Sequence, residues 1–259
     1  MTHPLFDIRG RLALVTGSSR GIGLALARGL LQAGTNVVLN GRDPDALAAA
    51  ATALAAGDPS WPGRVRPLPF DVTDEAAVTE AIEVIERDIG PVDILVNNAG
   101  RQVRGPVTSY PLSAWDAIVA ANLTSAFLVG REVARRMVPR GRGKIINIAS
   151  LQSEASRPGI APYAATKGGI KMLTKGMCAD LAASGIQVNA IGPGYFATDL
   201  NAPLKQDEDF DAWLTKRTPA GRWGEVDELV GTLLYLASPA SDFVNGQTIY
   251  VDGGVLAVL

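Results

Sequence analysis

The stretch Leu12-Ala-Leu-Val-Thr-Gly-Ser-Ser-Arg-Gly-Ile-Gly23 decides the fold of this chain. Its first four residues are apolar and predict a short buried strand, and a helical pattern begins at Ile22. The segment Thr16–Gly23, which joins the strand to the first residues of the helix, includes three glycines. Glycines allow a tight turn and close approach of another molecule to the backbone. A helix N-terminus offers free N–H groups and a positive dipole end to an anion. The unit is therefore typical of a phosphate-binding turn in a dinucleotide-binding domain.

Short apolar stretches alternate with helical patterns along the rest of the chain. Continuous apolar strands between helices indicate a parallel sheet covered on both faces. The expected strands are Leu12–Val15, Asn36–Leu39, Val65–Phe70, Ile94–Val96, Lys144–Ile148, Gln187–Ile191 and Thr248–Val251. The expected helices are Ile22–Ala33, Asp45–Ala55, Asp74–Asp88, Trp115–Val138, Pro162–Ser184 and Val226–Ala237. With right-handed crossovers, this order predicts an α/β fold: one doubly wound Rossmann-type domain over residues 1–259, with a seven-stranded parallel sheet and helices on both faces.

The composition limits the kinds of molecule that the chain is expected to bind. The chain has 24 Lys+Arg against 26 Asp+Glu and a formal charge of -2, which gives no general attraction to nucleic acid or an anionic membrane. Cys178 is the only cysteine and His3 the only histidine, so no intrachain disulfide, histidine triad or thiolate metal cage is expected. No apolar stretch approaches the ~18 residues of a membrane span, and no signal-peptide pattern opens the chain. A small-molecule partner and a cytoplasmic location are expected.

One segment, Tyr195–Trp223, breaks the alternation. It contains Pro203, an acidic cluster at 207–209 and two tryptophans, and it follows the strand that ends near Ile191. Ligands of doubly wound folds bind beyond the carboxyl ends of the strands, so this segment is predicted to be a lid over the site. An ordinary surface helical hairpin is the alternative.

The end of the second strand predicts which dinucleotide binds. Asn40-Gly41-Arg42 stands where an NAD-preferring protein places a carboxylate for the ribose hydroxyls. Arg42, with Arg20, is suited instead to a 2′-phosphate, and we therefore expect NADP(H). Asp43 follows one residue later and leaves NAD as a second option.

Two further strand ends supply candidate cofactor contacts. Asp71 is placed to accept a hydrogen bond from an adenine amine, although capping the next helix is an equally good role. Asn97-Asn98-Ala99-Gly100 combines small residues with amides that bridge neighbouring strands. The cofactor set predicted from these patterns is Gly17, Ser19, Arg20, Gly21, Ile22, Gly23, Arg42, Asp71, Val72, Asn98, Ala99 and Gly100.

Tyr163 and Lys167 lie four residues apart, a step that stacks two side chains on one face of a helix. A phenol titrates near ~10 and must fall by roughly 3 units, about 4 kcal/mol, to exchange protons at neutral pH. One cation about 4 Å away supplies about that much at an effective dielectric of about 20. The spacing thus predicts an acidified tyrosine, and the alternative is a surface pair at helical spacing.

With these motifs in place, the chain resembles the short-chain dehydrogenase/reductase family over essentially its whole length. The resemblance is carried by the Thr16–Gly23 turn, Asp71, Asn97–Gly100, Asn122, Ser150, Tyr163-Ala-Ala-Thr-Lys167, and Pro193-Gly194 followed by Thr198. It implies four catalytic residues: Tyr163 exchanges a proton, Ser150 binds the substrate oxygen, Lys167 lowers the tyrosine pKa, and Asn122 holds a water. It also implies cofactor contacts from Tyr163, Lys167, Pro193, Gly194 and Thr198.

Further stretches, among them Ile148-Ala-Ser-Leu-Gln-Ser-Glu154 and Arg217-Thr-Pro-Ala-Gly-Arg-Trp223, resemble members of the family that interconvert D-gluconate and 5-dehydro-D-gluconate. A sugar acid requires a fork-shaped cation and short polar groups near the reacting carbon. Besides Ser150 and Tyr163, the expected substrate contacts are Arg104, Gln152 and Glu154, with Arg101 as the alternative carboxylate clamp.

Two other functions remain open at this stage. A 3-oxoacyl-carrier-protein reductase, or another NADP(H)-dependent carbonyl reductase, is the alternative enzyme. Its acidic partner protein would dock on a basic face formed by Arg131, Arg135, Arg136, Arg140 and Arg142. A nucleotide-sensing protein without turnover is the third. The apolar tail Val255–Leu259 suggests burial between subunits, and the family resemblance implies a homotetramer.

Overall fold

The computed structural model describes residues 3–58, 60–61, 63–198 and 201–258. Seven strands form one sheet: β1 (Leu12–Val15), β2 (Asn36–Gly41), β3 (Val65–Pro69), β4 (Ile94–Asn97), β5 (Gly143–Ile148), β6 (Ile186–Pro193) and β7 (Thr248–Val251). Their order is β3-β2-β1-β4-β5-β6-β7, and every neighbouring pair is parallel. The chain thus reverses direction across the sheet after β3, which makes β1 and β4 the switch point. The predicted α/β fold class is confirmed.

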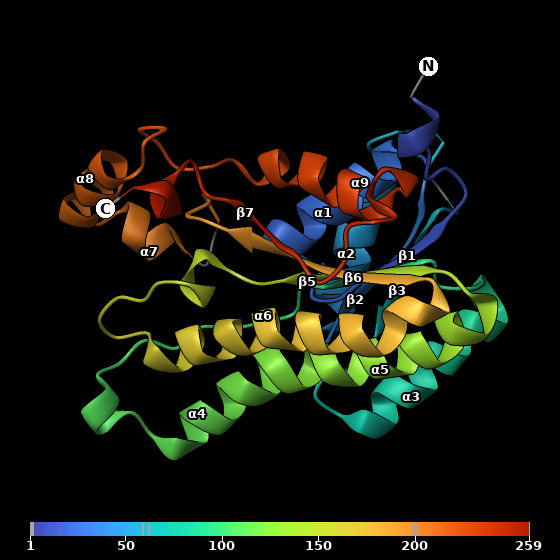
Figure 1. Ribbon diagram of the computed structural model, residues 1–259, viewed down its shortest axis with the longest axis horizontal. Helices are drawn as coiled ribbons and strands as arrows, with labels where there is room; N and C mark the ends of the chain where they lie inside the picture. The colour runs from blue at the N-terminus through green and yellow to red at the C-terminus, as the bar shows by residue number, and fades with distance from the viewer. Residues whose placement is uncertain (1–2, 59, 62, 199–200, 259) are drawn as a thin grey trace.

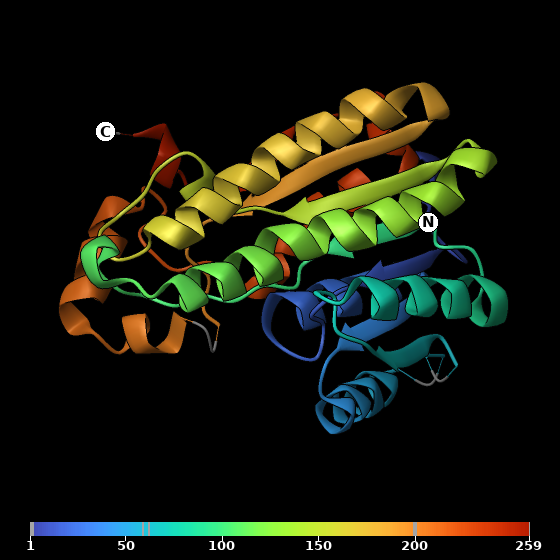
Figure 2. The same ribbon diagram turned by 90° about the horizontal axis from the view of Figure 1, so that it is seen from below.

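Helices cover both faces of this sheet (Figure 1). On one side lie α1 (Gly21–Gln32), α2 (Pro44–Ala55) and α9 (Val230–Ala237), whose Leu26, Leu47 and Leu233 are fully buried in one apolar core. On the other side lie α3 (Glu75–Val84), α4 (Leu112–Val119), α5 (Ser125–Met137) and α6 (Ala161–Leu181). Figure 2 shows α3, α5 and α6 side by side beneath the strands, where Ile82 and Val129 join the second core. The strands are buried from both sides, which explains their unbroken apolar sequences.

The expected long helix from Trp115 to Val138 differs in two ways from the structure. It begins three residues earlier, at Leu112, and it contains a π-helical turn at Ala120–Thr124 between α4 and α5. Such turns often occur at functional sites, and this one contains Asn122. A second π-helical turn, Ile85–Ile89, replaces the end of the helix that was expected to reach Asp88.

The helical run Leu112–Arg140 also corrects the expectation about apolar stretches. An 18-residue window in it reaches a mean hydropathy of 1.4, which by length and composition alone is enough to cross a bilayer. The run packs against α3 and α6 in the layer beneath the sheet. Within that window 33% is buried, so one side of the run packs on the domain and the rest is exposed.

The 195–223 segment starts directly after β6 and forms two helices, α7 (Ala202–Lys205) and α8 (Glu208–Arg217). Both lie at one end of the sheet in Figure 1. Aromatic rings hold α8 in place: Phe210 contacts Tyr195 with ring centroids 5.7 Å apart, and Tyr195 contacts Trp223 at 5.8 Å. We call Tyr195, Phe210, Trp213 and Trp223 the aromatic cluster. The segment's residues Asp199 and Leu200 lie outside the described part of the chain.

Candidate active site

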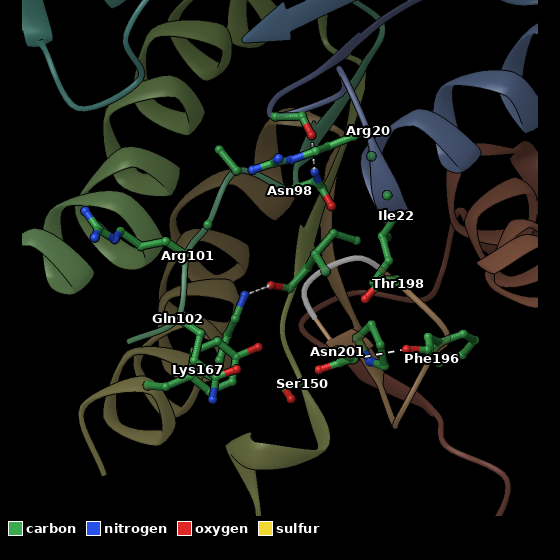
Figure 3. A pocket seen from close by; sticks show the side chains of 18 of the residues that line it. Arg20, Ile22, Asn98, Arg101, Gln102, Ser150, Lys167, Phe196, Thr198 and Asn201 are labelled. Carbon is green, nitrogen blue, oxygen red and sulfur yellow. Dashed lines mark hydrogen bonds between the residues drawn. The ribbon is translucent and has the colours of Figure 1, made fainter. Parts of the chain in front are cut away.

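A cavity of about 610 Å³ opens at the carboxyl ends of the strands (Figure 3). The residues that line it come from the glycine turn, from the ends of β2 to β6, from α6 and from the 195–223 segment. The predicted residues among them are Gly17, Ser19, Arg20, Gly21, Ile22, Gly23, Arg42, Val72, Asn98, Ala99, Gly100, Ser150, Gln152, Tyr163, Lys167, Pro193, Gly194 and Thr198. The fold thus gathers one wall from segments that lie far apart in the sequence.

The glycine turn has the geometry of a phosphate cradle. Gly17 and Gly21 have φ angles of +61° and +57°, a region that favours glycine. A Cβ atom on Gly23 would lie 2.4 Å from the carbonyl oxygen of Gly17 and 2.4 Å from Nδ2 of Asn98. Within the described chain, Arg20 at the N-cap of α1 makes no side-chain capping bond, so the first N–H groups of the helix stay available. The turn therefore fits the pyrophosphate of a dinucleotide.

Buried polar side chains fix this turn against its neighbours. Asn98 donates from Nδ2 to the carbonyl oxygens of Thr16 and Gly17, both at 2.9 Å. The Oγ1 atom of Thr16 accepts from the backbone N–H groups of Asn98 and Ala99 at 3.0 and 3.1 Å. Asn40 accepts from the N–H of Gly17 at 3.3 Å, a role that the sequence analysis did not assign to it. These bonds hold β1, β2 and β4 in register around the turn.

The three charged residues near the ends of β2 and β3 differ in how they are used. Arg42 lines the cavity with 76% of its side chain exposed, and its Nη1 lies 4.0 Å from Asp71. Asp43 instead caps α2 by accepting from the N–H groups of Asp45 and Ala46. The carboxylate on which the NAD alternative depends is therefore used within the protein. Asp71 accepts from the N–H and Oγ1 of Thr73, and among the described residues the cavity wall includes Phe70 and Val72 but not Asp71.

The side chains of Ser150, Tyr163 and Lys167 converge at the end of β5. Ser150 is buried, and its Oγ accepts from the N–H of Gln152 at 3.1 Å. Lys167 is 5% exposed, donates from Nζ to the carbonyl oxygen of Ile148 at 2.7 Å, and lies 5.7 Å from the centre of the Tyr163 ring. Helix α6 presents both Tyr163 and Lys167 to the cavity, as the four-residue spacing predicts.

Burial sets the acidities of Tyr163 and Lys167 in this structure. Burial raises the pKa of Tyr163 to about 12, and the hydrogen bond with Ser150 offsets only part of that rise. Burial also lowers the pKa of Lys167 to about 8. In this structure desolvation of the phenolate dominates, and the Lys167 ammonium is hydrogen-bonded to a backbone carbonyl. The lowering of the tyrosine pKa by Lys167 stays a prediction for the site with its cofactor bound. At neutral pH the phenol keeps its proton.

The buried amine of Lys167 has a consequence for stability. In the unfolded chain it holds its proton up to about pH 10.5, and in the folded chain only up to about pH 8. Between these values the unfolded state binds more protons, so stability rises with pH. We expect the free energy of unfolding to gain about 2 kcal/mol more between pH 7 and 9.5 in the wild type than in Lys167→Met. Urea titrations at one protein concentration measure this, and equal gains would contradict it.

Asn122 acts on the backbone from its π-helical turn. It is buried, accepts from the N–H of Arg101 at 2.7 Å, and donates from Nδ2 to the carbonyl oxygen of Arg101 at 2.9 Å. The same amide lies 3.2 Å from Oγ1 of Thr166 on α6. The side chain thus ties the loop after β4 to α6 beside Tyr163 and Lys167. Its role in holding a water stays a prediction.

The structure places the predicted substrate residues in different surroundings, some on the cavity wall and some outside it. Gln152 lines the cavity and donates from Nε2 to the Tyr195 hydroxyl at 3.3 Å. Glu154 pairs with Lys171 and accepts from the hydroxyl of Tyr250, and among the described residues the cavity wall includes neither Glu154 nor Arg104. Glu154 is therefore engaged elsewhere, which disagrees with its expected substrate contact.

Arg101, the alternative carboxylate clamp, lines the cavity wall, but Figure 3 shows its guanidinium directed away from Ser150 and Lys167.

Sequence reasoning missed several residues of the wall. The unassigned wall residues include Asn40, Phe70, Gln102, Arg157, Tyr195 and Asn201. Of these, Tyr195 and Asn201 lie in the segment predicted to cover the site, which was the available signal. Arg157 stands alone in a loop without a motif.

Comparison with known proteins places this geometry in a family. Residues 17–256 match the family model described as Enoyl-(Acyl carrier protein) reductase. The chain is 54% identical to gluconate 5-dehydrogenase of Gluconobacter oxydans, with all of both chains covered. It is 48% identical to 5-keto-D-gluconate 5-reductase of Escherichia coli K12, over 99% of this chain and 100% of the relative.

A solved structure agrees with these relatives. The gluconate 5-dehydrogenase of Burkholderia cenocepacia, in complex with NADP and tartrate, superposes with a TM-score of 0.94 at 54% identity, with 99% of each chain covered. The parallel seven-stranded fold agrees with that superposition over the full chain. The chain therefore belongs to the short-chain dehydrogenase/reductase family.

Proposed function

We propose that the protein is an NADP(H)-dependent oxidoreductase that interconverts D-gluconate and 5-dehydro-D-gluconate. The observation that carries this proposal is the meeting of Ser150 and Tyr163 with the glycine turn on one cavity. The named activities of the 54% and 48% identical relatives support the sugar-acid substrate. NADP in the solved relative supports the cofactor.

In this proposal the cavity residues divide into two groups. The glycine turn, Arg42, Asn98 and the 193–198 stretch hold the cofactor, which supplies or accepts the hydride when bound. A Cβ on Gly194 would lie 2.6 Å from Cα of Asp252, so glycine at this position keeps the end of β6 close to the chain after β7. Ser150 binds the substrate oxygen and stabilises its developing negative charge, and the protonated Tyr163 donates a proton to it.

NADP(H) preference depends on Arg42. Its guanidinium is largely exposed on the cavity wall, while the nearby carboxylate of Asp43 caps α2. Arg42→Ala is expected to lower the ratio of kcat/KM for NADPH over NADH at least about tenfold, because a charge-assisted contact to the 2′-phosphate is lost.

Steady-state kinetics with both cofactors measure that ratio. Arg28→Ala is the matched control, since Arg28 is an exposed arginine of α1 that pairs with Asp227. An unchanged ratio in Arg42→Ala would remove Arg42 from the cofactor site.

The 195–223 segment is proposed to act as the lid. Tyr195, Phe196, Thr198, Asn201 and Leu204 all line the cavity, and the aromatic cluster anchors α8 beside it. Closure over bound substrate would exclude water from the reacting atoms.

One assay tests the function directly. Purified protein is given NADPH or NADH with 5-keto-D-gluconate, 2-keto-D-gluconate or an acetoacetyl thioester, and cofactor oxidation is followed. We expect rapid turnover only with 5-keto-D-gluconate and NADPH. Turnover of the thioester without turnover of the keto acid would replace this proposal with a 3-oxoacyl-carrier-protein reductase.

The charges on α5 and in the residues just after it weigh against that alternative. The five arginines that would form a basic docking face are each paired: Arg131 with Glu75 and Glu132, Arg135 with Glu132, Arg136 with Glu83, Arg140 with Glu86 and Arg142 with Asp93. A face whose cations are already paired attracts an acidic partner weakly.

A homotetramer and a cytoplasmic location complete the proposal. Leu112, Trp115 and Phe127 expose 73%, 40% and 44% of their surface along α4 and α5, which suits burial against another subunit. In the C-terminal tail, Val255 packs on its own chain while Val258 is 46% exposed, and Leu259 lies outside the described residues. Light scattering of the purified protein measures the assembly.

A further inference from the structure

Arg157 occupies a position on the cavity wall that no motif predicted. It lies in the loop between the short helix after Ser150, Leu151–Ser153, and the start of α6. The parallel loop after β4, which carries Arg104, contacts this one through a backbone hydrogen bond from Gly105 to Gly159 at 3.0 Å. Two arginines therefore stand on adjoining loops: Arg157 lines the cavity, and Arg104 lies outside the described cavity wall.

The aromatic cluster fixes the side chain of Arg157. Its guanidinium carbon lies 5.3 Å from the centre of the Phe210 ring, a cation–π contact with α8. Phe210 is held in turn by Tyr195 at 5.7 Å and Trp213 at 5.3 Å between ring centroids. A guanidinium held in contact with a fixed ring loses little further freedom when its N–H groups bind a planar anion.

The guanidinium also has unused donors. Its Nε is buried, and among the described residues it has no hydrogen-bond partner. An unsatisfied buried N–H is costly, and a positive charge at such a site attracts an anion from solution.

Arg104 adds a second positive charge near Arg157 and does not neutralise it. The pKa of Arg104 is lowered by partial burial and then by the charge of Arg157, and only Tyr195 acts in the opposite direction. The two cations are thus near enough to repel one another. A carboxylate placed between them would remove that repulsion and satisfy both forks.

We propose that Arg157, in cation–π contact with Phe210 and on the loop that adjoins the loop of Arg104, binds the carboxylate of the sugar acid and so selects acids over neutral ketoses. This rests on the proposed function. It gives Arg157 the role expected of Arg104 or Arg101, with Arg104 as the second cation. It also links substrate choice to the lid, because displacement of α8 removes the ring on which the guanidinium rests.

L-Sorbose gives a matched test, since it carries a CH₂OH group where 5-keto-D-gluconate carries its carboxylate. The measured quantity is the ratio of kcat/KM for the keto acid to kcat/KM for L-sorbose, with NADPH saturating. In Arg157→Gln this ratio is expected to fall at least about tenfold through a higher KM for the keto acid, with kcat changed less than about threefold. Lys216→Gln removes one exposed charge from α8, the helix that carries Phe210, outside the described cavity wall, and is expected to keep the wild-type ratio.

Two further measurements guard against a folding defect. Arg157→Lys keeps the charge but loses the planar fork, and is expected to fall between the wild type and Arg157→Gln. Tartrate inhibition, competitive with the keto acid, reports carboxylate binding without turnover and is expected to weaken at least about tenfold in Arg157→Gln.

The outcomes separate the two proposals. A wild-type enzyme without activity on 5-keto-D-gluconate overturns the proposed function itself. An active wild type whose ratio and tartrate inhibition are unchanged in Arg157→Gln overturns the assignment of Arg157 and leaves the function standing. A fall in the ratio for Arg104→Gln but not for Arg157→Gln overturns it as well and gives the carboxylate to Arg104.

Discussion

Replacing Tyr163 with phenylalanine is expected to lower kcat for reduction of 5-keto-D-gluconate by at least about a hundredfold while NADPH still binds. The change removes one oxygen from a ring that lies on the wall of the cavity beside Ser150. The phenol is the proton donor of the proposed reaction, and burial keeps it protonated at neutral pH. Because the ring itself remains, the shape of the cofactor site is preserved.

Steady-state rates and titration of NADPH fluorescence measure the two halves of this expectation. Tyr235→Phe is the control, since Tyr235 lies on α9 and outside the described wall of the cavity. A loss of less than about tenfold, which corresponds to about 1.4 kcal/mol, would show that another group delivers the proton. A parallel loss of NADPH binding would instead point to a structural role for the hydroxyl.

Gly23→Ala is expected to raise the Kd for NADPH by more than about a hundredfold, equivalent to about 3 kcal/mol. The added Cβ would lie 2.4 Å from the carbonyl oxygen of Gly17, so the turn must open to admit it. Opening the turn also moves Asn98, whose amide bonds hold Thr16 and Gly17 in place. The backbone cradle and its tie to β4 are therefore lost together.

Gly231→Ala supplies the contrast for that change. Gly231 is exposed in α9, and in the described structure an added Cβ would meet open space. The same substitution should therefore stabilise the fold by about 0.5–1 kcal/mol and leave NADPH binding unchanged. Equal Kd values for Gly23→Ala and the wild type would mean that the turn does not hold the cofactor.

The sequence was sufficient for the fold because its signals are local and repeated. Each strand is a short apolar run buried from both sides, and the order of strands and helices leaves few topologies. The π-helical turn at Ala120–Thr124 was beyond reach, because one extra residue in a helical turn leaves almost no trace in hydrophobic periodicity.

The site was predicted well where the backbone dictates the residue and poorly where side chains meet across loops. Gly17 and Gly23 are required by their backbone surroundings, and Tyr163 and Lys167 by helical spacing. The proposed role of Arg157 depends on its contact with the ring of Phe210, which lies more than fifty residues further along the chain, so no local sequence pattern contains the pair. Glu154 was placed at the substrate by proximity in sequence, but its contacts are with Lys171 and Tyr250.

The aromatic cluster also gives the protein an optical reporter. Two of its four tryptophans, Trp213 and Trp223, stand at α8, one half exposed and the other buried beside Tyr195. The emission of an indole depends on its contact with water and on energy transfer to a neighbouring chromophore such as a reduced nicotinamide. Stopped-flow fluorescence of the unlabelled enzyme therefore tests the proposed movement of α8 and times it against the chemical step.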